Sequence, residues 1–177
     1  TLGVTASIKV GIPPGYHVLA NYAVSIDIRN HSKLTSYSPF LFEGTEDTPI
    51  SITSSDSTAE GIEIISAGQS ILKNVLFKSM PAVHDKQWGR IGTVTFYESP
   101  VKLKGCHFYN SKAIVGVNLI RSDFEFVECE FQGMENAINV DYSKGIFTKC
   151  VFEKCRGNAI NSLMGKLQIN KLYAKDI

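Results

Sequence analysis

Polar side chains recur at regular intervals in the second half of the chain. Aligning Val94, Val117, Ile138 and Ile160 as equivalent positions brings the next residues into one outward row, formed by Thr95, Asn118, Asn139 and Asn161. Four positions beyond the aligned residues come Glu98, Arg121 and Tyr142, and Asp141 precedes Tyr142. These carboxylates, guanidinium, phenol and amides offer the hydrogen-bond donors and acceptors that binding a glycan or a protein partner requires. We call this set the polar stripe.

Two interpretations of the polar stripe stay open. Stacked side-chain amides can hydrogen-bond from one repeat to the next, and serines at the positions that follow can do the same. These serines are Ser99, Ser122 and Ser143. In this interpretation the stripe is turn architecture with a solvated Glu98–Arg121 pair. In the alternative, it is a binding groove that faces outward.

An insertion provides a second candidate surface. Phe77 and Phe108 are 31 residues apart, whereas later repeats are about 22 residues long, so roughly nine residues protrude around 80–90. This loop contains Trp88, His84 and Arg90. Loops on a rigid scaffold often carry function, and an exposed Trp offers a flat apolar platform for a sugar ring. The alternative is that Trp88 packs back over the surface of the repeats.

The stripe also allows an enzymatic alternative, a polysaccharide lyase or related sugar-modifying enzyme acting on an acidic polysaccharide. A lyase needs a base to remove a proton and a cation to neutralise the neighbouring carboxylate. Arg121 and Lys144 could supply these groups, and Asp141 could orient Arg121. No pair of acids recurs on adjacent repeats to hold Ca²⁺. We therefore expect no metal and no cofactor, and we favour a non-catalytic protein.

The spacing of these residues follows an internal repeat. Three segments close on Cys-x-Phe, namely 101–108 (VKLKGCHF), 124–131 (FEFVECEF) and 145–152 (GIFTKCVF). Their final residues, Phe108, Phe131 and Phe152, are 23 and 21 residues apart. A fixed period near this length is typical of stacked units, each of which buries its apolar face against the next.

The cysteines of the repeat are expected to pack inside the protein. Cys106, Cys129 and Cys150 occupy one position of successive units, where a small apolar side chain fills the interior well. A straight row of thiols does not match the tetrahedral geometry of a zinc site. Cys155 follows its Phe by three residues, and we place it in a turn, as a free thiol or one that pairs with a partner.

The same anchor extends the repeat in both directions. Upstream, Phe77 is preceded by Leu72 at the spacing of the later units. Downstream, we align Leu172 with the anchor, which puts Leu167 in the position of Leu72. The chain stops at Ile177 without an evident polar cap, and an uncovered terminal repeat exposes a sheet edge. We therefore expect a piece of a longer protein, with further coils or end-to-end association.

Apolar and polar residues alternate throughout these units, which predicts strands. An antiparallel sandwich is one alternative, but it would not place Cys-x-Phe at one phase of every unit. The sequence predicts an all-β right-handed parallel β-helix of about seven or eight coils, with equivalent residues stacked about 4.8 Å apart. We assign residues 1–60 to a lead-in with the first irregular coils and residues 61–177 to regular coils of one continuous domain.

Composition agrees with this fold and limits the partners. The chain has 177 residues, of which 44% are hydrophobic, and its formal net charge is +1. Nucleic acid is disfavoured as a partner, because binding it needs clustered Lys and Arg without competing acids. No stretch of about 18 apolar residues suggests a membrane span.

Residues 60–177 resemble the β-helix repeats of the pectate-lyase-like superfamily. The runs GTVTFYES, VNLIRSDFEF and NVDYSKGIF are similar to β-helix regions of bacterial surface and secreted proteins. The resemblance implies an extracellular or cell-surface location and, for many members, binding or cleavage of acidic polysaccharides. Asn139 and Asn161 stand where those regions often carry acids. The favoured function is a non-catalytic module that binds a glycan or a protein partner on the stripe and the 80–90 loop.

Overall fold

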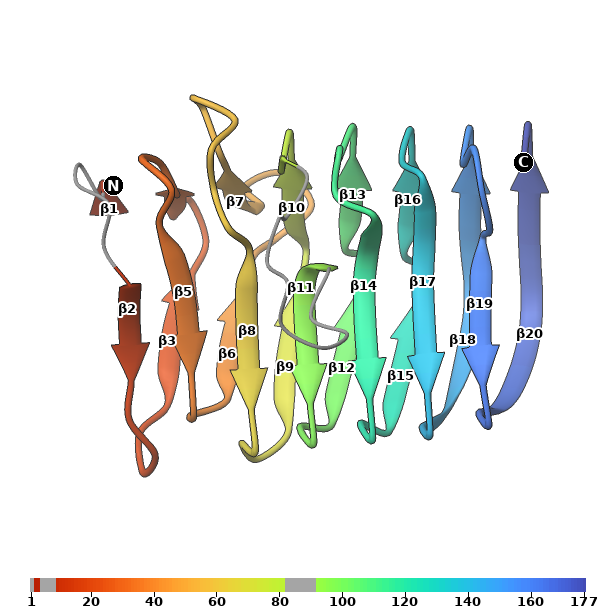
Figure 1. Ribbon diagram of the computed structural model, residues 1–177, viewed down its shortest axis with the longest axis horizontal. Helices are drawn as coiled ribbons and strands as arrows, with labels where there is room; N and C mark the ends of the chain where they lie inside the picture. The colour runs from red at the N-terminus through yellow and green to blue at the C-terminus, as the bar shows by residue number, and fades with distance from the viewer. Residues whose placement is uncertain (1, 4–8, 82–91) are drawn as a thin grey trace.

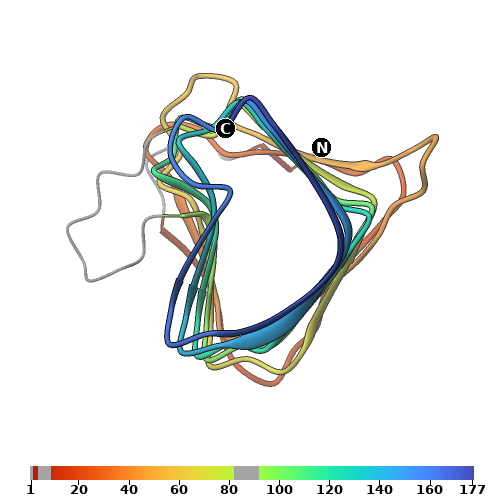
Figure 2. The same ribbon diagram turned by 90° about the vertical axis from the view of Figure 1, so that its right-hand side faces the viewer.

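The structure is a computed structural model that describes residues 2–3, 9–81 and 92–177. The described residues form strands and turns without a helix, wound as a parallel β-solenoid of about 7 turns. Figure 1 shows the strands of successive turns side by side along the long axis. Viewed along that axis, the turns superimpose as a roughly triangular outline (Figure 2). The predicted all-β parallel helix is confirmed.

Each full turn contributes a strand to each of three parallel ladders. The first ladder is a separate sheet of β2 (Lys9–Ile12), β5 (Lys33–Ser36), β8 (Ile62–Ile65), β11 (Gly92–Tyr97), β14 (Val115–Ile120), β17 (Asn136–Asp141) and β19 (Ile160–Leu163). The second ladder contains β3 (Val18–Asn21), β6 (Phe40–Glu43), β9 (Ser70–Lys73), β12 (Val101–Lys104) and β15 (Phe124–Val127). The third contains β1 (Leu2–Gly3), β4 (Ser25–Asp27), β7 (Ile50–Thr53), β10 (Val75–Lys78), β13 (His107–Tyr109) and β16 (Glu130–Gln132). The long strands β18 (Lys144–Glu153) and β20 (Lys166–Lys175) run through the second and third ladders and join these two ladders into one sheet.

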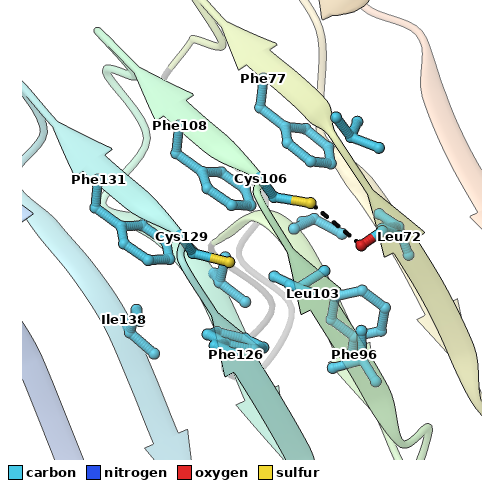
Figure 3. Close-up of a cluster of buried hydrophobic side chains, with 14 of the residues drawn as sticks. Leu72, Phe77, Phe96, Leu103, Cys106, Phe108, Phe126, Cys129, Phe131 and Ile138 are labelled. Carbon is cyan, nitrogen blue, oxygen red and sulfur yellow. Dashed lines mark hydrogen bonds between the residues drawn. The ribbon is translucent and has the colours of Figure 1, made fainter. Parts of the chain in front are cut away.

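The phenylalanines of the repeat form one continuous column inside the solenoid. Phe77 pairs in register with Phe108, Phe108 with Phe131, and Phe131 with Phe152. Their rings stack nearly parallel, with centroids 4.5, 4.9 and 5.1 Å apart. Such stacking adds about 0.5–1.5 kcal/mol per pair to the burial of the rings. Figure 3 shows part of this column against the neighbouring turns.

The repeat cysteines line the interior beside the phenylalanines, as predicted. Cys106, Cys129 and Cys150 are free thiols with at most 1% of their surface exposed. The Cys106 thiol donates to the carbonyl oxygen of Leu72 at 3.4 Å (Figure 3). Cys155 is also free and fully buried. It lies just after the end of β18, and its pairing with a partner chain stays a prediction from the sequence.

The predicted alignment of the last turn is wrong by two residues. In β20, Leu172 pairs with Cys150 and Ala174 pairs with Phe152, so Leu172 is not the equivalent of the phenylalanine anchor. Ile169, not Leu167, pairs with Phe147. A shift by two residues keeps every side chain on the same face of a strand, so alternation alone does not distinguish the two registers.

Single residues in the left-handed backbone region turn the chain between the ladders. At the corner between the first and second ladders, these residues are Ser66, Glu98, Arg121, Tyr142 and Met164, with φ between 47° and 53°. A non-glycine side chain in this region is uncommon and carries a modest cost. The main-chain N–H groups of Ser66, Glu98, Arg121 and Tyr142 compensate by bonding the next turn, as from Glu98 to Ile120 and from Arg121 to Asp141, both at 2.9 Å.

Truncation of Phe131 tests the aromatic column. Phe131→Ala removes a fully buried ring that stacks on both neighbours, and it should lower the free energy of unfolding by about 3–5 kcal/mol. Cys129→Ala removes a smaller group and should cost about 1–2 kcal/mol. Urea denaturation measures both, with exposed Asn170→Ala as a control that should change the value by less than about 0.5 kcal/mol.

The buried position of Cys129 beside the aromatic column predicts that its thiol is unreactive in the native protein. Burial raises the pKa of the Cys129 thiol well above its ordinary value, which removes the thiolate that alkylating reagents attack. Alkylation followed by mass spectrometry should leave Cys129 unmodified in the native protein and modify it in urea. Rapid labelling under native conditions contradicts the inward placement.

Candidate functional site

The amide row of the polar stripe is an in-register ladder on the outer face of the first strand ladder. Thr95 pairs with Asn118, Asn118 with Asn139, and Asn139 with Asn161. Asn139 Nδ2 donates to Asn118 Oδ1, and Asn161 Nδ2 donates to Asn139 Oδ1, both at 2.9 Å. Each amide therefore bonds the amide of the next turn. This chain of bonds stabilises the stacking of the turns.

Accessibility changes along the row. Thr95 and Asn118 are buried, with 1% and 0% of their surface exposed, whereas Asn139 is half-buried and Asn161 is exposed. Glu63 continues the row on the turn before Thr95 and is itself buried, with its carboxylate 2.8 Å from the Lys33 ammonium. A ligand that approaches the stripe therefore meets Asn139 and Asn161 rather than Asn118.

Three stripe residues lie at the corner between the first and second ladders, which we call the first corner, one on each of three successive turns. The side chains of Glu98 and Arg121 are 43% and 58% exposed, and Tyr142 is 53% exposed. Arg121 Nη1 donates to Glu98 Oε1 and to the hydroxyl of Tyr97, both at 3.2 Å. This is the predicted solvated pair, and such exposed pairs contribute little stability.

The serines next to the corner are structural. The Ser122 amide donates to Ser143 Oγ at 2.8 Å, and the Ser99 amide donates to Ser122 Oγ at 2.9 Å. Each hydroxyl donates in turn to the carbonyl two residues before it, as from Ser122 to Ile120 at 3.0 Å. All three serines are buried. The turn-architecture interpretation therefore describes the serines and amides, while the corner residues remain accessible.

The residues of the enzymatic alternative are not assembled around Arg121. The Asp141 carboxylate accepts from Asn139 Nδ2 at 2.9 Å, and Asp141 meets Arg121 through its main-chain carbonyl. Lys144 lies 3.8 Å from the Asp123 carboxylate with 71% of its side chain exposed. The structure therefore gives Asp141 a different partner from the one that the sequence suggested.

The candidate residues of the insertion lie outside the described part of the structure. They are His84, Trp88 and Arg90, within residues 82–91. Their proposed role in binding stays a prediction from the sequence.

Sequence reasoning missed a cluster on the outer face of the third ladder. His107 Nδ1 lies 3.0 Å from Glu130 Oε2 and 2.8 Å from the Tyr109 hydroxyl, and that hydroxyl donates to Glu130 Oε2 at 3.1 Å. Burial and the neighbouring Glu130 carboxylate raise the pKa of Tyr109 to about 12, so its hydroxyl remains a donor at neutral pH. The signal was available, because His107 and Tyr109 alternate around Phe108 and Glu130 stands one repeat after His107.

Two further findings apply to the described residues. They contain no group of three or more His, Cys, Asp or Glu side chains arranged to hold a metal ion. Nor do residues 2–3, 9–81 and 92–177 include a helix with the length and apolarity of a membrane span.

Removal of one serine hydroxyl tests the structural role of the serine row. Ser122→Ala leaves the buried Ser99 amide without its acceptor, so the free energy of unfolding should fall by about 1–3 kcal/mol. Asn161→Ala, at the exposed end of the amide row, should cost less than about 1 kcal/mol. Equal stability of Ser122→Ala and wild type in urea titrations would argue against the bonded row.

Comparison with known proteins agrees with the geometry. The model of the family described as a right-handed beta helix region matches residues 17–171 of the chain. No curated protein and no solved structure matches the chain significantly. The matched range covers most of the described turns, whose strands pair in parallel from one turn to the next. The chain belongs to the right-handed β-helix family.

Proposed function

We propose that this chain is a non-catalytic β-helix module of a secreted or surface protein and that it binds a glycan along its first corner. The observation that carries the proposal is the exposed row of Glu98, Arg121 and Tyr142, which three successive turns present at one corner. These side chains belong to a rigid scaffold, because the main chain beneath each is bonded to the next turn.

The row suits a chain-like ligand. Equivalent positions on successive turns are about 4.8 Å apart, so the three residues span roughly 10 Å parallel to the solenoid axis. Asn161 extends the accessible surface to a fourth turn. A ligand that lies along the axis can therefore contact several turns at once without any change in the backbone.

The chemistry of the corner suits sugar hydroxyls. The Arg121 guanidinium supplies several donors, the Glu98 carboxylate supplies acceptors, and the Tyr142 phenol combines an apolar ring with a polar tip. The pairing of Arg121 with Glu98 holds both side chains near one geometry before a ligand arrives. Such preorganisation lowers the entropic cost of binding. From the sequence, we propose that the 80–90 loop binds glycan as well, with Trp88 as an aromatic platform.

The geometry gives less support to the lyase alternative. A uronate carboxylate would have to displace Glu98 from Arg121, since the two side chains already form an ion pair at 3.2 Å. The Asp141 carboxylate bonds Asn139 rather than the Arg121 guanidinium. The cation and base that β-elimination requires are therefore not brought together around a common point.

Substitutions at the corner test the glycan proposal. Arg121→Ala should reduce retention on a polysaccharide array at least about tenfold, because hydrogen bonds to a charged group are lost. Tyr142→Ala should reduce it by a similar factor. The thermal midpoint should change little in both variants, because both side chains are exposed. Arg156→Ala removes an exposed Arg elsewhere on the surface and should bind like wild type.

Trp88 has its own test in the same assay. Trp88→Ala should abolish retention while leaving the thermal midpoint nearly unchanged. An equal loss of thermal stability would instead assign Trp88 to packing.

Ultraviolet absorbance separates the module from the lyase. β-Elimination leaves a conjugated unsaturated uronate, so incubation with pectate, alginate and glycosaminoglycans should produce no rise in absorbance if the module proposal holds. A rise that disappears in Arg121→Ala would overturn the proposal and make the corner an active site.

A further inference from the structure

A pocket of about 250 Å³ lies on the outer face of the solenoid, between the third ladder and the connection that leads into it from β6. One wall is that connection, which contributes Thr45, Glu46 and Pro49. It projects beyond the later turns at the right of Figure 2. The opposite wall is the strand face that carries Leu76, His107 and Tyr109. This pocket involves none of the polar stripe residues.

The loop wall is held in place by hydrogen bonds. Its first residue, Gly44, donates to the Lys73 carbonyl at 2.9 Å and accepts from Asn74 Nδ2 at 3.0 Å. Within the loop, the Thr45 hydroxyl accepts from the Thr48 amide at 3.0 Å. A Cβ at Gly44 would lie 2.4 Å from the Asn74 carbonyl oxygen, so only glycine allows this close approach. The pocket is therefore preformed.

The floor of the pocket depends on a second glycine. Gly105 lines it with φ of 59°, and a Cβ there would lie 2.4 Å from Asn74 Oδ1. The residues at the same corner of the next two turns are Glu128 and Lys149, which carry long side chains. The missing side chain at Gly105 thus accommodates Asn74 and leaves space beside it.

The strand wall presents two ordered rings. The His107 and Tyr109 rings are stacked, with centroids 5.6 Å apart and planes inclined by 26°. Glu130 and the Tyr109 hydroxyl both contact His107 Nδ1, and the His107 side chain is 32% exposed. These contacts fix the imidazole and leave Nε2 for solvent or a ligand, since no described residue bonds it. Leu76 and Pro49 add apolar surface to the two rings.

The charge of the lining selects the class of ligand. Among the described residues that line the pocket, Glu46 carries a carboxylate and none is Lys or Arg. Glu130 adds a second carboxylate next to His107. A uronate or other anion would therefore meet repulsion without a cation to compensate it. The other polar groups are a hydroxyl from Thr45, an amide from Asn74, an imidazole and a phenol, which match neutral hydroxyl groups.

We propose that this pocket is a ligand site for one neutral pyranose unit, with Glu46 accepting hydrogen bonds from its hydroxyls and the His107 and Tyr109 rings bounding its apolar face. The volume suits a single sugar ring rather than a chain. The proposal is independent of glycan binding at the first corner, because the two surfaces share no residue.

Backbone amide NMR of the full chain, titrated with methyl pyranosides of glucose, galactose and mannose, tests the site. At a typical ligand efficiency, a molecule of about 13 heavy atoms binds with a Kd on the order of 1 mM. At least one pyranoside should give saturable shifts at the amides of Thr45, Asn74 and Tyr109. D-Glucosamine and galacturonic acid serve as cationic and anionic probes at the same positions.

A matched pair of loop variants sharpens the test. Glu46→Gln should weaken the pyranoside about tenfold, because hydrogen bonds to a charged acceptor become neutral ones. Asp47→Asn, which alters the adjacent residue outside the pocket lining, should leave the Kd unchanged. Arg121→Ala should also bind the pyranoside like wild type, so failure at this pocket and failure at the first corner are distinguishable.

Three results would overturn the proposal. The first is the absence of saturable shifts with all three pyranosides up to about 20 mM, well above the expected Kd. The second is binding by Glu46→Gln as tight as by wild type. The third is a preference for glucosamine or galacturonic acid over the neutral sugars, which would assign the pocket to a charged ligand.

Discussion

Parallel register is the constraint on which the rest of this structure depends. The backbone hydrogen bonds between turns place equivalent residues above one another at about 4.8 Å. Inside the solenoid this builds the aromatic column from Phe77 to Phe152. Outside it builds the amide row and the corner row, which have the same spacing. Core packing and surface chemistry are therefore two consequences of one arrangement, and a change of register in one turn would displace both.

Polar side chains divide into those that join turns and those that remain accessible. The serine hydroxyls and the Asn118–Asn139–Asn161 amides bond main chain or one another, so most of their hydrogen-bonding capacity is used within the fold. The corner residues have main-chain bonds to the next turn and side chains in solvent. The His107 cluster combines both properties, because His107 and Tyr109 contact Glu130 of the next turn and still line a pocket. Both candidate surfaces thus consist of residues that the fold holds in position without covering them.

The sequence predicted the repeat well because the Cys-x-Phe spacing and the alternation of apolar residues directly reflect the inward faces of strands. It failed at Leu172, where the alternation continues but the Cys-x-Phe motif is absent, so nothing in the pattern fixed the register. The stripe was found because its members share one phase of the repeat. The pocket was not, because its loop wall occurs between β6 and β7 in one turn and has no equivalent in the periodic segments. The burial of Asn118 could not be predicted from the sequence either. Alternation indicates which face of a strand a side chain occupies, but it does not indicate whether that face is accessible to solvent.

The first corner has a consequence for how such a protein can change over evolution. Ser66, Glu98, Arg121, Tyr142 and Met164 differ in charge, size and polarity, yet all occupy the same left-handed conformation. At Ser66, Glu98, Arg121 and Tyr142 the backbone is satisfied by main-chain bonds to the following turn and places no demand on the side chain. Each turn thus contributes one surface position whose identity can vary at little cost in stability. The first corner therefore presents variable side chains at a fixed spacing. A new binding specificity can arise there by exchange of single residues, while the core sequence stays constant.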